Sequence, residues 1–138
     1  MKNIFQRLIY ALIFCLLFSA CSTVKGPPTL ANNHWELQDV KGVDIYLAFN
    51  IKHGIFIEFN DSTKKFNGYT GCNNFFGEYT VDGNKLHFSD MSTTRMACPQ
   101  MKSENLYLQA ISQVDNYRID GKKLLLYKGE EVLATYKR

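Results

Sequence analysis

From position 34 onward, the chain is made of short segments in which apolar and polar residues alternate. In the clearest of them, Ile55, Ile57 and Phe59 fall on the same side of the expected strand. Alternation with a period of two is typical of strands that pack one face on a core. The segments that we interpret as strands are residues 35–38, 44–49, 55–59, 65–69, 77–81, 86–88, 117–119, 124–127 and 132–136. The pattern predicts a mainly β domain.

Turn residues separate these segments. Asp82-Gly83 and Asp120-Gly121 each stand between two of the expected strands. Asp-Gly pairs favour the tight turns of antiparallel hairpins, because those turns require positive φ angles. We therefore expect neighbouring strands to pair in antiparallel fashion.

One stretch has helical spacing instead. Its apolar residues recur three or four positions apart and are Tyr107, Ala110, Ile111 and Val114. This spacing places them on one face of a helix, and Pro99 suits a first helical turn. The sequence therefore predicts one helix between about Pro99 and Val114, and an α+β fold class that is mainly β.

The first 20 residues have the pattern of a leader. Lys2 and Arg7 make the start of the chain positively charged. Residues 8–18 then form an apolar run of eleven, and the small residues 19–20 stand directly before Cys21. A transmembrane helix needs about 20 apolar residues, whereas this order of charge, apolar centre and small residues is that of a signal peptide. The segment resembles a bacterial lipoprotein signal. It predicts cleavage after residue 20 and lipid attachment at Cys21.

A lipid on Cys21 would hold the protein in the cell envelope. The lipoprotein resemblance implies a diacylglyceryl group, and two or more acyl chains anchor a protein stably. Ser22 stands where aspartate would resemble an inner-membrane retention signal, so we expect the outer membrane, facing the periplasm or the surface. Residues 21–33, with Pro27-Pro28, are interpreted as an extended tether. The alternative is an ordinary secretory signal that ends at a cysteine.

Composition limits the partners of the remaining chain. Without residues 1–20, 118 of the 138 residues remain, which is the size of one domain. They carry 14 basic and 13 acidic residues, a net charge of +1. A nearly neutral domain lacks the basic surface that nucleic acids require. We expect no nucleic-acid partner, and the sequence indicates no oligomeric state.

The four cysteines have different expected roles. Cys15 lies in the leader and Cys21 carries the lipid. Cys72 and Cys98 remain, and an even pair in an oxidising compartment predicts one structural disulfide. Closing a loop of about 27 residues would stabilise the fold by about 3–4 kcal/mol in the chain-entropy model. The alternative is two buried free thiols.

Side chains that carry chemistry form no recognisable catalytic or metal-binding pattern. His34, His53 and His87 lie far apart in the sequence, without zinc-site spacing. No phosphate-binding loop, nucleophile elbow or dinucleotide fingerprint occurs. We therefore expect neither a metal nor a cofactor. Three carboxylates that only the fold could bring together are Asp90, Glu104 and Asp115.

A block of glycines, polar residues and a cysteine lies in the middle of the chain and reads Asn67-Gly68-Tyr69-Thr70-Gly71-Cys72-Asn73. Matching blocks follow at residues 77–79, 83–86, 94–99 and 117–124. Together they resemble the META domain family of small bacterial envelope lipoproteins, over about residues 34–138. The resemblance implies a compact antiparallel β structure that is barrel-like and carries one helix. It implies no activity, because the family has no settled biochemical function, although some members are linked to heat stress.

The motif residues also have structural interpretations. Gly68, Gly71 and Gly77 would allow positive φ or a close approach of two backbones. Asn73 would bond backbone groups in a turn. Met96 would fill an irregular gap in the core.

We therefore expect a non-enzymatic envelope lipoprotein that binds a protein, a peptide or a small apolar compound, with a role in stress. The aromatic residues proposed as its binding surface, with core packing as the alternative, are Tyr69, Phe75, Phe76 and Tyr79. The competing interpretation is an envelope thiol-dependent hydrolase or redox protein that uses Cys72 and Cys98.

Overall fold

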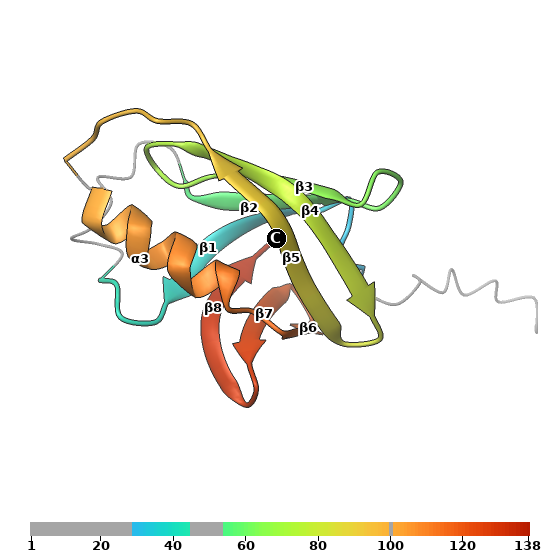
Figure 1. Cartoon of the computed structure of the whole chain (residues 1–138). Helices are drawn as coiled ribbons and strands as arrows, with labels where there is room; N and C mark the ends of the chain where they lie inside the picture. The colour runs from blue at the N-terminus through green and yellow to red at the C-terminus, as the bar shows by residue number, and fades with distance from the viewer. Residues whose placement is uncertain (1–28, 45–53, 100) are drawn as a thin grey trace, which may run out of the picture.

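The computed structural model describes residues 29–44, 54–99 and 101–138. Within these ranges, eight antiparallel strands form one closed, barrel-like sheet with a helix beside it, which confirms the predicted fold class (Figure 1). In chain order the elements are β1 (His34–Val40), β2 (Phe56–Asn60), β3 (Lys65–Tyr69), β4 (Asn74–Asp82), β5 (Lys85–Thr93), α3 (Met101–Ser112), β6 (Asn116–Asp120), β7 (Lys123–Lys128) and β8 (Glu131–Lys137).

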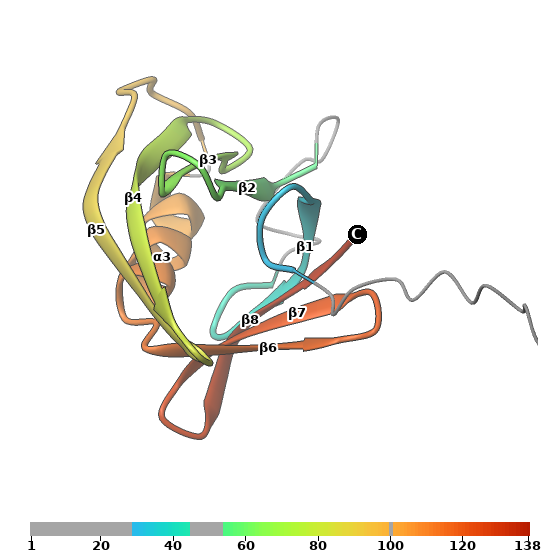
Figure 2. The ribbon, with the colours of Figure 1, turned by 90° about the vertical axis from the view of Figure 1, so that its right-hand side faces the viewer.

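The sheet closes because its first and last strands pair. Each strand is antiparallel to the next along the chain, and β1 pairs with both β2 and β8. The seam between β5 and β6 is short, with Lys85 opposite Asn116. The helix α3 connects these two strands, packs against β5 and β8, and lies across one end of the ring (Figures 1 and 2). Within the described ranges, no helix is long and apolar enough to cross a membrane.

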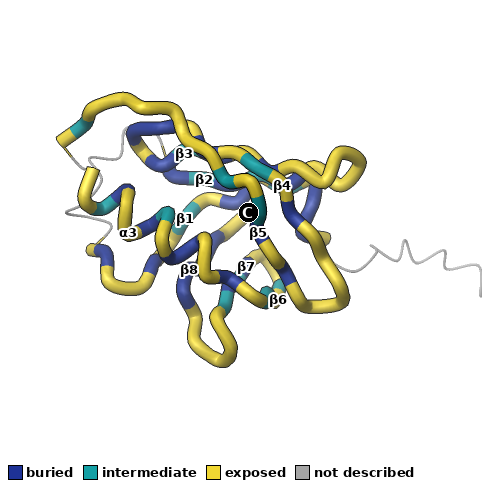
Figure 3. The backbone as a smooth tube through the Cα atoms, in the orientation of Figure 1, coloured by how far each residue is buried: buried dark blue, intermediate teal, exposed yellow. Residues whose placement is uncertain are grey.

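The interior of the ring is filled largely by aromatic side chains. The largest rings with almost no exposed surface are Trp35, Phe66, Phe75, Tyr79, Tyr107 and Tyr136. Figure 3 shows buried positions along the strands and along part of α3, whereas the hairpin turns are exposed. The hydroxyls of Tyr107 and Tyr136 lie 2.9 Å apart, and burial raises the pKa of both tyrosines above its ordinary value.

Local patterns predicted these elements well. Ile55, Ile57 and Phe59 all face the core. Gly83 and Gly121 have φ angles of 60° and 59° in the hairpins β4–β5 and β6–β7, the left-handed region that tight hairpin turns require. The apolar face expected for the helix is buried, although α3 begins two residues later than expected.

The packed domain extends further toward the N-terminus than the predicted start at His34. Leu30 and Ala31, which we placed in the tether, belong to the hydrophobic core. The indole N–H of Trp35 donates a hydrogen bond to the Leu30 carbonyl at 2.8 Å, so a buried ring holds this segment in place. The leader, Cys21 and nearly all of the expected strand at 44–49 lie outside the described residues.

Candidate functional site

The motif block surrounds a disulfide that joins the β3–β4 loop to the segment before α3. Cys72 and Cys98 are bonded, with their Cα atoms 6.2 Å apart, which confirms the predicted pair. Cys72 is buried, and the carbonyl of Cys98 accepts a hydrogen bond from the backbone N–H of Met101. Two segments 26 residues apart in sequence are thus joined covalently.

Asn73 connects three segments beside the disulfide. Its Oδ1 accepts hydrogen bonds from the Thr94 hydroxyl and the Met96 backbone N–H, both at 2.7 Å. Its Nδ2 donates to Glu104 Oε2 at 3.0 Å and to the Met96 carbonyl at 3.2 Å. Asn73 therefore bonds backbone groups, as predicted, and additionally reaches a carboxylate on α3.

Glu104 completes this network from the first turn of α3. The Thr70 hydroxyl donates to Glu104 Oε1 at 2.6 Å and accepts a hydrogen bond from the Asn73 backbone N–H at 2.9 Å. Among the described residues, no buried side-chain nitrogen or oxygen lacks a partner. A buried network whose members are all satisfied makes a core rigid and unique. We call Thr70, Asn73 and Glu104 the motif network and interpret it as structural.

The three motif glycines determine shape. A Cβ atom on Gly68 would lie 2.3 Å from the Phe56 carbonyl oxygen, and one on Gly77 would lie 2.7 Å from that of Ser89. Gly71 has a φ of 94°, which residues with a side chain rarely adopt. All three positions therefore need glycine for the reasons that the sequence suggested.

The prediction that Met96 fills a gap in the core is wrong. Its side chain is 61% exposed, and Asn73 binds both its backbone N–H and its carbonyl. The core beside the motif is already occupied by the rings of Phe75 and Tyr107, which pack edge to face with centroids 5.6 Å apart. The conformation of the main chain, not the thioether, is what the network uses at this position.

The candidate carboxylates take up separate positions among the described residues. Glu104 belongs to the motif network. Asp115 accepts hydrogen bonds from the Gly129 backbone N–H in the β7–β8 turn, and Asp90 is exposed on β5. Each carboxylate has its own surroundings, so the three do not form a site.

The histidines are separated as well. His34 is on β1 and His87 on β5, both exposed, and His53 lies outside the described residues. In the part of the chain that the structure describes, no group of three or more His, Cys, Asp or Glu side chains could hold a metal ion.

The four aromatic residues proposed as a binding surface divide into two pairs. Phe75 and Tyr79 are core residues, whereas Phe76 is 48% exposed. Tyr69 is half-buried, and its hydroxyl donates to the Gly71 carbonyl at 2.9 Å. Only the second pair remains accessible to a ligand.

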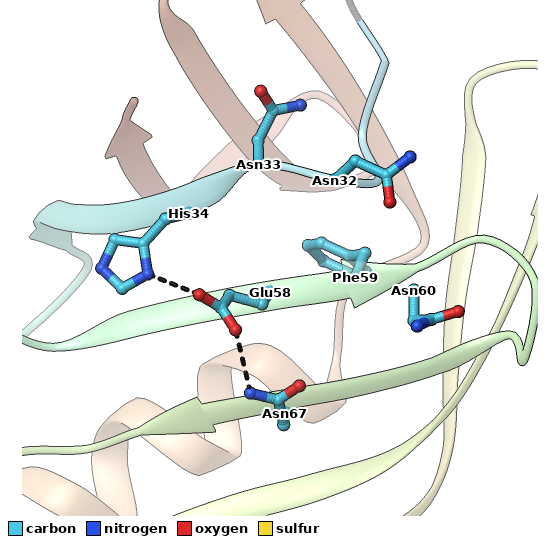
Figure 4. A pocket seen from close by; sticks show the side chains of 7 residues that line it. All are labelled: Asn32, Asn33, His34, Glu58, Phe59, Asn60 and Asn67. Atoms are coloured by element: carbon cyan, nitrogen blue, oxygen red, sulfur yellow. Dashed lines mark hydrogen bonds and ion pairs between the residues drawn. The ribbon is translucent and has the colours of Figure 1, made fainter.

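A polar hollow beside the start of β1, the end of β2 and the neighbouring part of β3 was not anticipated from the sequence. It has a volume of about 290 Å³ (Figure 4). Six of its seven lining residues are polar, and the full set is Asn32, Asn33, His34, Glu58, Phe59, Asn60 and Asn67. The polar lining presents planar amide, carboxylate and imidazole groups.

Glu58 lies between His34 and Asn67 in this hollow (Figure 4). Its Oε1 is 2.7 Å from His34 Nδ1, and its Oε2 accepts a hydrogen bond from Asn67 Nδ2 at 3.2 Å. The hydrogen bond with His34 is the main cause that lowers the pKa of Glu58, so the carboxylate is ionised at neutral pH. The His34 ring also packs on the Phe56 ring, with centroids 4.4 Å apart. These contacts hold the carboxylate in one orientation.

Comparisons with known proteins bear on the fold and the family. The family model of the META domain matches residues 28–138. This span includes the buried residues before β1. The comparison with curated proteins found no match.

Several solved structures are similar to this chain. A protein from Burkholderia xenovorans, solved by NMR, is 22% identical, with 87% of this chain and 96% of that chain covered and a TM-score of 0.63. A second NMR structure is 23% identical, with 78% of this chain and 90% of that chain covered and a TM-score of 0.60. A DUF4847 family protein from Bacteroides vulgatus, solved by crystallography, is 18% identical, with 78% of this chain and 93% of that chain covered and a TM-score of 0.63. At these identities the likeness shows the fold.

Proposed function

Because the chain belongs to the META domain family, we propose that it is an envelope lipoprotein whose domain binds a ligand and catalyses no reaction. The leader supports export and a lipid on Cys21. The disulfide between Cys72 and Cys98 carries the proposal. Structural disulfides persist in oxidising compartments outside the cytoplasm, and this one leaves neither thiol free for chemistry. The lipid would hold the protein at the outer membrane.

The alternative is a thiol-dependent hydrolase or redox protein. A nucleophilic cysteine needs a free thiolate, activated by a base or a positive charge beside it. Around Cys72 Sγ the polar neighbours recorded among the described residues are Asn73 Nδ2 at 3.4 Å and the Met96 carbonyl at 3.6 Å. Amide groups of this kind do not take up a proton at neutral pH, so the surroundings support the structural role.

Membrane fractionation of a Cys21→Ser variant tests the anchor. We expect the variant to leave the membrane fraction, because the acyl chains attach to that thiol. Cys15→Ser is the matched control, since this cysteine lies in the part of the leader that is removed. A Cys21→Ser protein that still sediments with the membranes would contradict the anchor.

The ligand is the least constrained part of the proposal. A protein, a peptide and a small apolar compound were expected, but the polar hollow around Glu58 favours a polar ligand. The stress-related role rests on the family resemblance alone. A strain without the gene that survives heat shock as well as its parent would count against that role.

A further inference from the structure

A row of side chains crosses five neighbouring strands on the outside of the ring. Strand register places the members of this row opposite one another in the order His34, Glu58, Asn67, Phe76 and Ser92. Directly opposed residues share one face of a sheet, and all five are exposed or half-buried. With strands about 4.8 Å apart, the row is about 19 Å long. We call these five residues the outer row.

The outer row keeps hydrogen-bonding capacity that the described residues do not use. Asn67 spends one amide N–H on Glu58, which leaves its second N–H and its carbonyl oxygen. The Glu58 carboxylate accepts two hydrogen bonds and has about four lone-pair sites. Asn32 and Asn60 border the same hollow (Figure 4), and the Asn60 amide oxygen accepts a hydrogen bond from the Thr63 backbone N–H. Unused donors and acceptors therefore lie around one small volume.

We propose that the outer row binds an uncharged glycan, with one sugar ring in the hollow and the next ring against Phe76. Adjacent sugar hydroxyls both donate and accept, and fixed amide and carboxylate groups can bind them in pairs. The C–H face of a sugar packs on an aromatic ring, and the half-exposed Phe76 lies one strand from Asn67. The hollow, about 290 Å³, is slightly smaller than the range of about 300–1,000 Å³ for small-molecule sites. That size suits a single ring.

The charge of this face and its few apolar side chains fit an uncharged glycan better than a polyanion or a protein. Glu58 is ionised, and the next row along pairs Lys65 with Glu78, so this face has no excess of cations to attract a polyanion. Protein interfaces need a cluster of buried apolar and aromatic side chains at their centre, whereas Phe76 is the one apolar member of the outer row and its other four members are polar. An uncharged glycan fits both conditions. The expectation that this glycan is a polymer of the cell envelope rests on the proposed function, whereas glycan binding at the outer row does not depend on it.

Titration with a soluble tetramer of N-acetylglucosamine tests the proposal. The full chain, extracted in detergent from whole cells, is followed by calorimetry and by amide NMR shifts, which we expect in β1 to β5 around the outer row. Asn67→Ala and Phe76→Ala should each weaken binding at least tenfold. Asn105→Ala on α3 and Val132→Ala on β8 remove exposed side chains of the same kinds elsewhere, and they should leave the affinity within twofold.

Three results would overturn the proposal. The first is no binding of the tetramer, or of the tetramer of glucose, at millimolar concentration. The second is an equal loss in the control variants, or shifts away from the outer row. The third is that the stem peptide of peptidoglycan, without sugars, produces the same shifts. Should Asn67→Ala not fold, Asn67→Asp keeps the side-chain size and sets a carboxylate beside Glu58, and it should also weaken binding. None of these results depends on where Cys21→Ser fractionates, so the two proposals fail separately.

Discussion

The domain contains two Asn–Glu pairs of nearly equal geometry and very different surroundings. Asn73 Nδ2 donates to Glu104 Oε2 at 3.0 Å, and Asn67 Nδ2 donates to Glu58 Oε2 at 3.2 Å. The first pair is buried and all its polar atoms have partners. The second is open to solvent and has donors and acceptors left over. Residue type and distance alone therefore do not separate a structural pair from a binding pair, whereas burial and unused capacity do.

The comparison also explains why family membership predicts so little about activity here. Of the residues by which the chain resembles the META family, Gly68, Cys72 and Asn73 are buried, and they provide a close backbone contact, the disulfide and the motif network. Such positions specify a fold. The polar hollow uses His34 and Glu58, which the family motif does not include, and Asn67 at its very edge. The family resemblance therefore specifies the motif network rather than the ligand of this surface.

Removing the disulfide should have the largest effect on the buried side of the comparison. In the double variant Cys72→Ala, Cys98→Ala, the unfolded chain loses a constraint across 26 residues. We expect the free energy of unfolding to fall by about 3–4 kcal/mol, measured by urea denaturation. Glycan binding at the outer row should persist wherever the variant is folded. A loss below about 1 kcal/mol would show that the motif network holds the loop without the crosslink.

Replacing Glu104 and Glu58 by alanine, one at a time, should have very different effects on stability. Glu104→Ala leaves the Thr70 hydroxyl and the Asn73 amide buried without their carboxylate. Each such loss costs about 1–3 kcal/mol. The Thr70 hydroxyl can still donate to the Asn73 carbonyl and Asn73 Nδ2 to the Met96 carbonyl, so we expect the lower part of the summed range, about 2–4 kcal/mol. Glu58→Ala, as the matched surface variant, should change stability by about 0.5 kcal/mol or less and should abolish glycan binding. Equal destabilisation by the two variants would end the distinction between the pairs.

Sequence patterns predicted the local parts of this molecule because those parts depend on neighbouring residues. Alternation predicted that Ile57 and Phe59 of β2, and Ile55 directly before it, face inward, and helical spacing predicted the buried face of α3. Met96 was misassigned because an apolar side chain does not have to be buried: more than half of a typical protein surface is apolar. Its position is set by main-chain bonds from Asn73, which no local pattern reports.

The polar hollow could not be predicted because it depends on register between strands. Alternation places Glu58 and Asn67 each on an outer face, but His34 and Glu58 are 24 residues apart in sequence. A shift of one residue in pairing would move every side chain of a strand to the other face. The closure of β1 on β8 and the bulges that adjust register at β4–β5 are tertiary features. The polar side chains can be found in the sequence, but only the pairing of strands in the closed sheet brings them together.

Within the core, the hydroxyls of Tyr107 and Tyr136 form a second buried pair to compare. Tyr107→Phe leaves the Tyr136 hydroxyl buried without its recorded partner, which should cost about 1–3 kcal/mol. The double variant to Phe should be more stable than either single variant, because no hydroxyl is then stranded. Urea denaturation of the three variants measures this coupling. Additive losses would show that the hydroxyls do not depend on each other.

The same pair predicts alkaline sensitivity. Both pKa values are raised in the folded state above the ordinary value of 10.0, so the unfolded chain loses these protons first. The stabilisation is complete below about pH 10 and declines as the pH rises above it. Denaturation midpoints at pH 8 and pH 11 should therefore differ more in the wild type than in the double Phe variant. A variant that loses as much as the wild type would assign the effect to other groups.

The smallest expected effect concerns the open pair and separates it most clearly from the buried one. The hydrogen bond with His34 lowers the pKa of Glu58 from 4.5, so its contribution to stability is present above about pH 4.5 and is lost as the pH falls further. His34→Ala removes that hydrogen bond, and the pKa of Glu58 should rise toward its ordinary value, as followed by NMR of the side-chain carboxyl carbon. Because both side chains are nearly half exposed, unfolding free energies of wild type and variant should stay nearly equal across this range. A large difference in stability would mean that the hollow is a structural element like the motif network, and the unused donors around Glu58 would then need another explanation than a ligand.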